Sequence, residues 1–195
     1  MKSKWVFAII LLMTACGGDD YIPRPQGYPR LELPQKKYQN ADIKSLAPFS
    51  FELPQYAALS LDTLSNYEVR NNWYNIYFKP FNATLHLTYH SVGTQEEMDS
   101  LIYDTRKLVN KQIDRAQDIR EMPITDINPK LDGVFFDIIG HTATNLNFYL
   151  SDYKKHFVRG ALYFNYAAAP DSVAPIYKFM KNDVEHLIKT FEWKK

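Results

Sequence analysis

The fold is decided by residues 84–102, which read TLHLTYHSVGTQEEMDSLI. The first half alternates apolar with polar side chains, as at Leu85 and Leu87, and a period of two is typical of a strand with one buried face. The second half opens with Thr94 and Glu97, the spacing of a capping box, which marks the first turn of a helix. Strand and helix follow one another within a few residues, which predicts a mixed fold in which a helix packs on a sheet.

The helical pattern continues downstream. Apolar residues three or four apart predict one buried helix face that ends before Pro123. Its members are Met98, Leu101, Ile102, Leu108, Val109, Ile113, Ala116 and Ile119. A second run at helical spacing, from Val173 to Phe191 behind Asp171 or Ser172 as its cap, predicts a helix at the end of the chain.

Strand-like runs lie on both sides of the first helix. Those upstream cover residues 49–53, 67–70, 73–78 and 84–90, with 79–83 as a hairpin connection; those downstream cover 134–139, 145–150 and 156–166, with a turn at 151–155. Connections of hairpin length predict antiparallel pairing. We therefore expect a single α+β domain, a twisted antiparallel sheet with two helices, and this order of elements resembles the fold of the PsbP and Mog1 proteins.

The N-terminus carries an export signal. Residues 1–15 consist of a positively charged end and an apolar run that is too short to span a membrane, which needs about 20 apolar residues. The run ends in MTAC at residues 13–16, which resembles the bacterial lipoprotein box, although Leu is more usual than Met13. We expect removal of residues 1–15 and lipidation of Cys16, with palmitate among the acyl chains. The alternative is ordinary secretion that leaves Cys16 as a free thiol.

A proline-rich segment follows the signal. Residues 16–48 have no sustained apolar period, which predicts a semi-extended stalk ahead of a globular domain at 49–195. Tyr21 and Tyr28 are more apolar than a spacer requires, so we mark them as possible partner contacts. The alternative is an arm that packs on its own domain.

Composition excludes several classes of protein. The chain has 23 basic and 22 acidic residues, a net charge of +1, and no long run of either sign, so nothing indicates nucleic-acid binding. A single cysteine excludes an internal disulfide and any multi-cysteine metal site.

A search for catalytic groups yields little. The sequence has no nucleophile elbow, phosphate-binding glycine loop or zinc-protease motif. His86 and His90 have the spacing of a zinc pair on a helix, but on a strand they lie about 13 Å apart, too far for one metal ion. We predict that they are outward polar positions, and we expect no catalytic residues, no metal, no cofactor and no enzymatic activity.

The least ordinary strand pattern lies at residues 154–164. Gly160 inside it indicates a bulge or a close approach of another group, and Arg159 shares a strand face with Phe157 and Ala161. We mark Arg159 and Gly160 as a possible partner-binding edge. The alternative is a structural ion pair between Arg159 and a carboxylate.

Several short motifs follow one another along the predicted mature chain. They are Cys16-Gly17, DYIPRP at 20–25, GYPR at 27–30, LP at 33–34, PFSFE at 48–52, WYNI at 73–76, LHLTY at 85–89, KHFVRGALYF at 155–164 and Trp193. Their order and spacing resemble those of the gliding motility lipoprotein GldD family. The resemblance implies a cell-envelope component that is needed for gliding and associated with type IX protein secretion, and it brings no catalytic residues.

On this basis we expect a lipid-anchored, non-catalytic docking or scaffold protein. Its expected partners are the membrane, through the lipid, and other proteins of the gliding or secretion machinery, without nucleic acid. The alternative is an envelope enzyme or ligand-binding module acting on peptidoglycan, lipid or glycan. We expect the protein in the outer membrane, facing the periplasm, with the inner membrane as the alternative.

Overall fold

The computed structural model describes residues 32–41, 47–61, 72–140, 142–165 and 170–194. The chain divides into two compact units, Met1–Glu32 and Leu33–Lys195, and every element below belongs to the second. The predicted signal peptide, Cys16, Tyr21, Tyr28 and the predicted strand at 67–70 lie outside the described residues.

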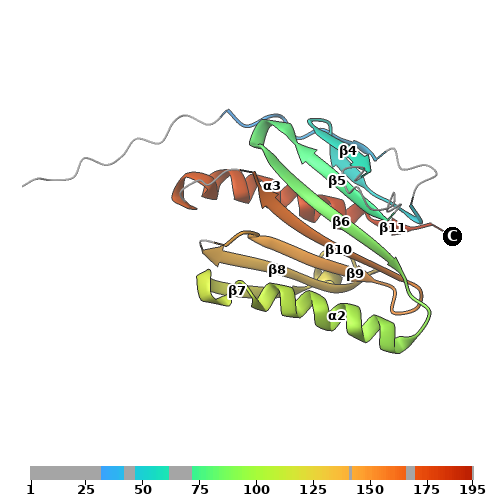
Figure 1. Ribbon diagram of the computed structural model, residues 1–195. Coiled ribbons are helices and arrows are strands. Elements are labelled where there is room, and N and C mark those ends of the chain that lie inside the picture. The colour runs from blue at the N-terminus through green and yellow to red at the C-terminus, as the bar shows by residue number, and fades with distance from the viewer. Residues whose placement is uncertain (1–31, 42–46, 62–71, 141, 166–169, 195) are drawn as a thin grey trace, which may run out of the picture. The chain divides into compact units, whose positions relative to one another are not determined.

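Seven strands form one sheet, in which every neighbouring pair is antiparallel (Figure 1). Across the sheet they are β4 (Ala57–Leu61), β5 (Trp73–Phe78), β6 (Ala83–Ser91), β10 (His156–Phe164), β9 (Leu146–Ser151), β8 (Asp132–Gly140) and β7 (Ala116–Pro123). Two small sheets pair β1 (Tyr38–Asn40) with β3 (Glu52–Pro54), and β2 (Phe49–Ser50) with β11 (Glu192–Trp193). Within the described ranges the α-helices are α2 (Gln95–Asn110) and α3 (Pro170–Thr190), and short 3-10 turns are η2 (Lys79–Phe81), η3 (Ile113–Arg115) and η4 (Ile124–Asp126).

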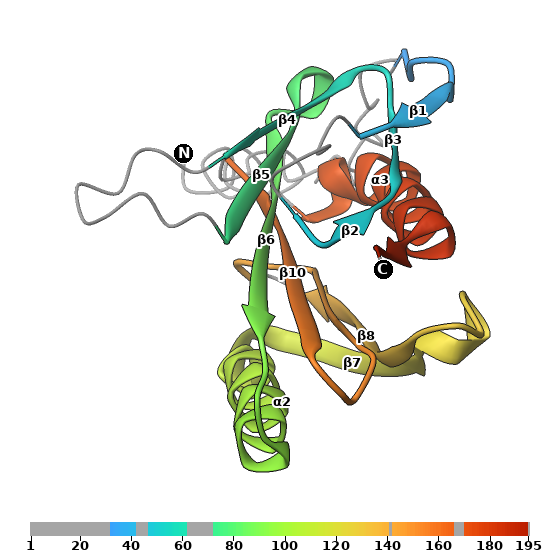
Figure 2. The ribbon, with the colours of Figure 1, turned by 90° about the vertical axis from the view of Figure 1, so that its right-hand side faces the viewer.

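The two helices cover opposite faces of the sheet (Figure 2). Successive side chains of a strand point to opposite faces, and Val158 packs in the cluster that holds Met180 of α3, whereas its neighbour Phe157 packs in the cluster that holds Met98 of α2. This arrangement confirms the predicted α+β class with an antiparallel sheet and two helices.

We call the apolar cluster that contains Met98 the α2 cluster, and the one that contains Met180 the α3 cluster. The α2 cluster covers only part of the sheet face on which α2 lies. Its strand residues, among those the structure describes, are Val134, Phe136, Ile138, Tyr149 and Phe157, with Ala116 and Ile119 at the edge. These belong to β7, β8, β9 and the start of β10. The outer side of β5, β6 and the rest of β10 therefore lies beyond the α2 cluster.

The first helix ends earlier than predicted. α2 stops at Asn110, and residues 116–123 form the edge strand β7. Ile119 packs with the α2 cluster, while Met122 packs with the α3 cluster on the other face. A strand that is partly buried on both faces, with a register shift at its start, reproduces the three-residue spacing of a helix. The prediction of helix up to Pro123 was therefore wrong.

The predicted capping box is present at the start of α2, with one of its two hydrogen bonds made to a different backbone N–H. The Thr94 hydroxyl accepts the Glu97 backbone N–H at 3.2 Å, as the motif predicts. The Glu97 carboxylate accepts the backbone N–H of Gly93, at 2.8 Å, rather than that of Thr94. The helix start predicted from the sequence is confirmed.

The compact unit begins before residue 49. Within residues 33–41, β1 pairs with β3, and the side chains of Lys36 and Tyr38 bind α3. The described end of the proline-rich segment therefore belongs to the folded unit, as in the alternative of an arm packed on its own domain. The predicted strand at 49–53 is divided between β2 and β3, which pair with different partners.

Candidate functional site

A cavity of about 340 Å³ lies on the sheet face beyond α2. Its lining residues come from β5, β6 and β10: Trp73, Asn75, His86, Leu87, Thr88, Arg159, Ala161 and Tyr163. We call this surface the Arg159 pocket.

Strand register builds the pocket in two rows. Thr88 of β6 stands opposite Trp73 of β5 on one side and Arg159 of β10 on the other. In the next row His86 stands between Asn75 and Ala161. The alternation that marks β6 as a strand thus places Thr88 between an aromatic residue and a charged one, and His86 between an amide and an alanine.

His86 is held in place by its neighbours. Its Nδ1 lies 2.6 Å from the Asn75 Oδ1, and its ring meets Tyr163 edge to face, with centroids 5.2 Å apart. His86 and His90 are both exposed and lie on the face away from the α3 cluster, which confirms that they are outward polar positions. Among the described residues, no group of three or more His, Cys, Asp or Glu side chains could hold a metal ion.

Arg159 is the charged member of the pocket. It is partly buried, and its Nε is enclosed without a hydrogen-bond partner. Among the described residues its guanidinium forms no ion pair, and none of those lining the pocket is Asp or Glu. Burial lowers the pKa of Arg159, and the nearby Tyr163 opposes that shift. The internal ion pair considered as the alternative for Arg159 is therefore not found in the described part of the chain.

Gly160 lies on the opposite face and has a packing role. A Cβ built on it would lie 2.2 Å from the ring of Phe148 on the neighbouring strand β9. The register of β10 with both neighbours is continuous, so the glycine marks a close approach and not a bulge. Arg159 and Gly160, adjacent in sequence, therefore do not form one surface.

A different charge, Asp183 of α3, is completely satisfied. Its side chain is 0% exposed, and Lys36 Nζ lies 3.0 Å from its Oδ1. The hydroxyls of Tyr38, at 2.8 Å, and Tyr56 also donate to this carboxylate. Burial and the hydrogen bond to Asp183 raise the pKa of both tyrosines. We call these four residues the α3 clamp.

Asp183 is not among the residues predicted from the sequence, although its position carries a signal. Asp183 follows Met180 by three residues and precedes Leu187 by four, so it stands on the apolar stripe of the helix. A charge on such a stripe indicates a buried partner.

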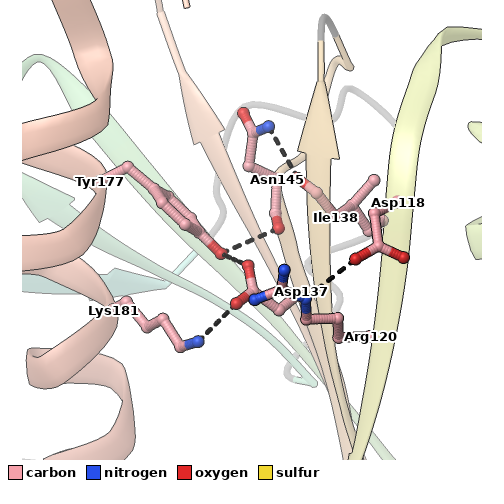
Figure 3. A network of polar contacts seen from close by, with 7 residues as sticks. All are labelled: Asp118, Arg120, Asp137, Ile138, Asn145, Tyr177 and Lys181. Carbon is pink, nitrogen blue, oxygen red and sulfur yellow. Dashed lines mark hydrogen bonds and ion pairs between the residues drawn. The ribbon is translucent and has the colours of Figure 1, made fainter. Parts of the chain in front are cut away.

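Asp137 of β8 forms a second satisfied network under α3 (Figure 3). Its carboxylate accepts from the Tyr177 hydroxyl and from Lys181 Nζ, both on α3. The Tyr177 oxygen also lies 3.1 Å from the carbonyl oxygen of Asn145. Burial and the bond to Asp137 raise the pKa of Tyr177, so this hydroxyl remains protonated at neutral pH.

A wider hollow of about 520 Å³ lies beside the α3 clamp. Its lining carries charges of both signs, including Asp126, Glu185 and Lys189. Two further lining groups already have partners, because Lys36 binds Asp183 and His186 Nε2 lies 2.7 Å from a Glu52 oxygen. This hollow therefore shows less unsatisfied chemistry than the Arg159 pocket.

Fold and site together define a class: an α+β protein with helices on both sheet faces and a small, arginine-bearing pocket on the part of one face beyond the helix. A family model described as gliding motility lipoprotein GldD matches residues 18–193. The chain belongs to the gliding motility lipoprotein GldD family.

Two further comparisons add little to this assignment. A search of curated proteins gives no match. Among solved structures, the chain is similar to the solution structure of cyanobacterial PsbP (CyanoP) from Synechocystis sp. PCC 6803, at 8% identity and a TM-score of 0.47, over 85% of this chain and 97% of that one. No helix among the described residues is long and apolar enough to cross a membrane.

Proposed function

We propose that this protein is a non-catalytic docking lipoprotein of the gliding and type IX secretion machinery, held to the outer membrane by lipid on Cys16. The family model, which matches residues 18–193, is the observation that carries the assignment to gliding. The match begins two residues after Cys16, so nearly the whole predicted mature chain shares the family pattern.

The docking role is supported by the Arg159 pocket. Trp, Tyr and Arg are the residues that contribute most to binding at protein interfaces, and the pocket brings together Trp73, Tyr163 and Arg159. Tyr163 is 37% exposed, which leaves part of its ring available to a partner. Asp183 and Asp137, by contrast, form ion pairs with lysines of the same domain.

The first test concerns the lipid anchor alone. Cys16→Ala removes the lipidation site and is expected to shift the protein from the membrane to the soluble envelope fraction and to abolish gliding. Cell fractionation and single-cell motility tracking measure both effects. Normal gliding by a Cys16→Ala protein that is no longer in the membrane would contradict the proposed anchor.

An enzyme or ligand-binding module acting on peptidoglycan, lipid or glycan is the second candidate, favoured by the cavity itself and by His86 within it. His86→Gln keeps a hydrogen-bonding group next to Asn75 but removes the ionisable ring. Because Gln can keep the hydrogen bond to Asn75 and leaves Trp73, Arg159 and Tyr163 in place, a docking protein is expected to retain most of its gliding, whereas an acid–base catalyst loses it. Loss of gliding by a folded and correctly localised His86→Gln protein would favour the enzyme.

A further inference from the structure

We propose that the Arg159 pocket receives a carboxylate of a protein partner, either an Asp or Glu side chain or a chain terminus. This inference rests on the proposed docking function and names the chemistry of the group that the docking surface recognises.

The first argument is charge. The Arg159 guanidinium is partly withdrawn from water, with its Nε enclosed and without a hydrogen-bond partner. A withdrawn charge is costly unless an opposite charge and hydrogen bonds compensate it. Among the described residues of the pocket no acidic side chain does so. We therefore infer that the complementary ligand is an anion from outside the described part of the chain.

The second argument concerns the type of anion. A guanidinium offers parallel N–H donors that match the two oxygens of a carboxylate. Arg159 is the one Lys or Arg among the lining residues, and around it lie the hydrogen-bonding groups of Asn75, His86 and Thr88 and the rings of Trp73 and Tyr163. One cation beside aromatic side chains suits a singly charged carboxylate on an organic body, whereas phosphate groups of higher charge are usually held by several cations or backbone N–H groups.

The third argument concerns size and source. A hollow of about 340 Å³ is at the small end of ligand sites and matches a protein side chain better than a whole lipid or an extended glycan. It accommodates one or two side chains of a protein. The floor is formed by side chains of three strands, and the aromatic and arginine composition is that of a protein hot spot. A protein carboxylate is thus the ligand that the pocket fits best.

Photocrosslinking in living cells of the native host provides the test. The full-length, lipidated protein carries benzoylphenylalanine at position 163, where the natural side chain is partly exposed at the pocket. We expect one protein adduct upon irradiation. Adding Arg159→Met, which keeps much of the side-chain volume but removes the charge, is expected to reduce adduct yield at least fivefold. The matched control is Arg115→Met, an exposed arginine on η3, which is expected to leave the yield unchanged.

Charge reversal then identifies the carboxylate. Mass spectrometry locates the crosslinked segment of the partner, and Arg159→Glu is combined with an acidic-to-Arg change in that segment. We expect each single change to abolish the adduct and the pair to restore at least half of it. For a chain terminus, amidation or extension of that terminus replaces the acidic-to-Arg change and is expected to abolish the adduct alone.

Three results would overturn the inference: an adduct that Arg159→Met leaves unchanged, an adduct to lipid or glycan in place of protein, or failure of the charge-reversed pair to restore any adduct. Residues 62–71, which precede β5 and lie outside the described residues, contain two acidic side chains, Asp62 and Glu68. Asp62→Asn and Glu68→Gln test for an internal carboxylate, and a loss from either as large as that from Arg159→Met is a fourth result that would overturn the inference. Thermal melts of each purified variant identify any that fail to fold. If Arg159→Met fails to fold, Arg159→Gln, which also removes the charge, replaces it with the same expected fivefold loss.

Failure of this inference is distinguishable from failure of the proposed function. If Cys16→Ala abolishes membrane location and gliding while Arg159→Met glides normally, the anchored docking role stands and only the pocket assignment is wrong. If Cys16→Ala has no effect on either, the proposed anchor itself is wrong, whatever the crosslinks show.

Discussion

Asp183 and Arg159 are charged side chains on opposite sides of one sheet, and both are withdrawn from water. They differ in whether the fold provides partners for the charge. Under α3, Asp183 is fully buried and receives one cation and two hydroxyls. On the other side, Arg159 is partly buried and has no ion pair among the described residues. The same physical cost is compensated within the fold in the first case and, among the described residues, left uncompensated in the second. An uncompensated charge of this kind indicates a surface that is completed by something other than the fold.

The largest effect is expected at the α3 clamp. Asp183→Ala leaves Lys36 and the hydroxyls of Tyr38 and Tyr56 without their acceptor, so we expect the free energy of unfolding to fall by about 3 kcal/mol. Urea denaturation of the purified protein measures the change. Asn182→Ala, at the neighbouring exposed position of α3, is the control and is expected to change stability by less than about 0.5 kcal/mol. Equal losses in the two variants would remove the contrast with Arg159.

An intermediate effect is expected at Gly160. Gly160→Ala forces a methyl group into the Phe148 ring, and we expect a loss of about 2 kcal/mol, with docking affected only as far as the protein unfolds. Gly93→Ala is the control, because its Cβ would meet its nearest neighbour at an ordinary 3.5 Å. Combining Gly160→Ala with Phe148→Leu is expected to cost less than the sum of the single changes, since the two side chains compete for one space. Simple additivity in denaturation experiments would contradict the packing role.

The smallest effect on stability is expected at Arg159 itself. Arg159→Met removes a charge that has no partner among the described residues, so we expect the free energy of unfolding to stay within about 0.5 kcal/mol of the natural protein or to rise. The same urea experiment measures it beside Asp183→Ala. A loss above about 1.5 kcal/mol would mean that Arg159 is compensated inside the fold after all, and the comparison between the two sides of the sheet would fail.

Much of the fold follows from local patterns. The alternation in β6 and the aromatic run in β5 predict strands that the structure contains, β5 with the same bounds. The pattern fails at β7, where burial on both faces imitates a helix, and at β4, whose short AALSL run is too weak a signal. Both failures occur at the two edges of the sheet, where a strand has a neighbour on one side only.

Less of the candidate site than of the fold could be predicted from the sequence. Arg159 stands out in the sequence because a charge interrupts an apolar strand, but its lack of a partner depends on which residues β5 and β6 place opposite it. The pairing of β10 with β6 joins residues that are 65 or more positions apart, such as His156 and Ser91. Local patterns carry no information on such a register, so Trp73, Asn75 and Tyr163 could not be assigned to the pocket in advance.

The α3 clamp also fastens the start of the compact unit. Lys36 and Tyr38 are the first described side chains of the compact unit to grip α3, and they do so through Asp183 near the middle of that helix. The described start of the compact unit is therefore fastened to a helix through Asp183, and its strand β1 pairs with β3 and not with the seven-stranded sheet that carries the Arg159 pocket.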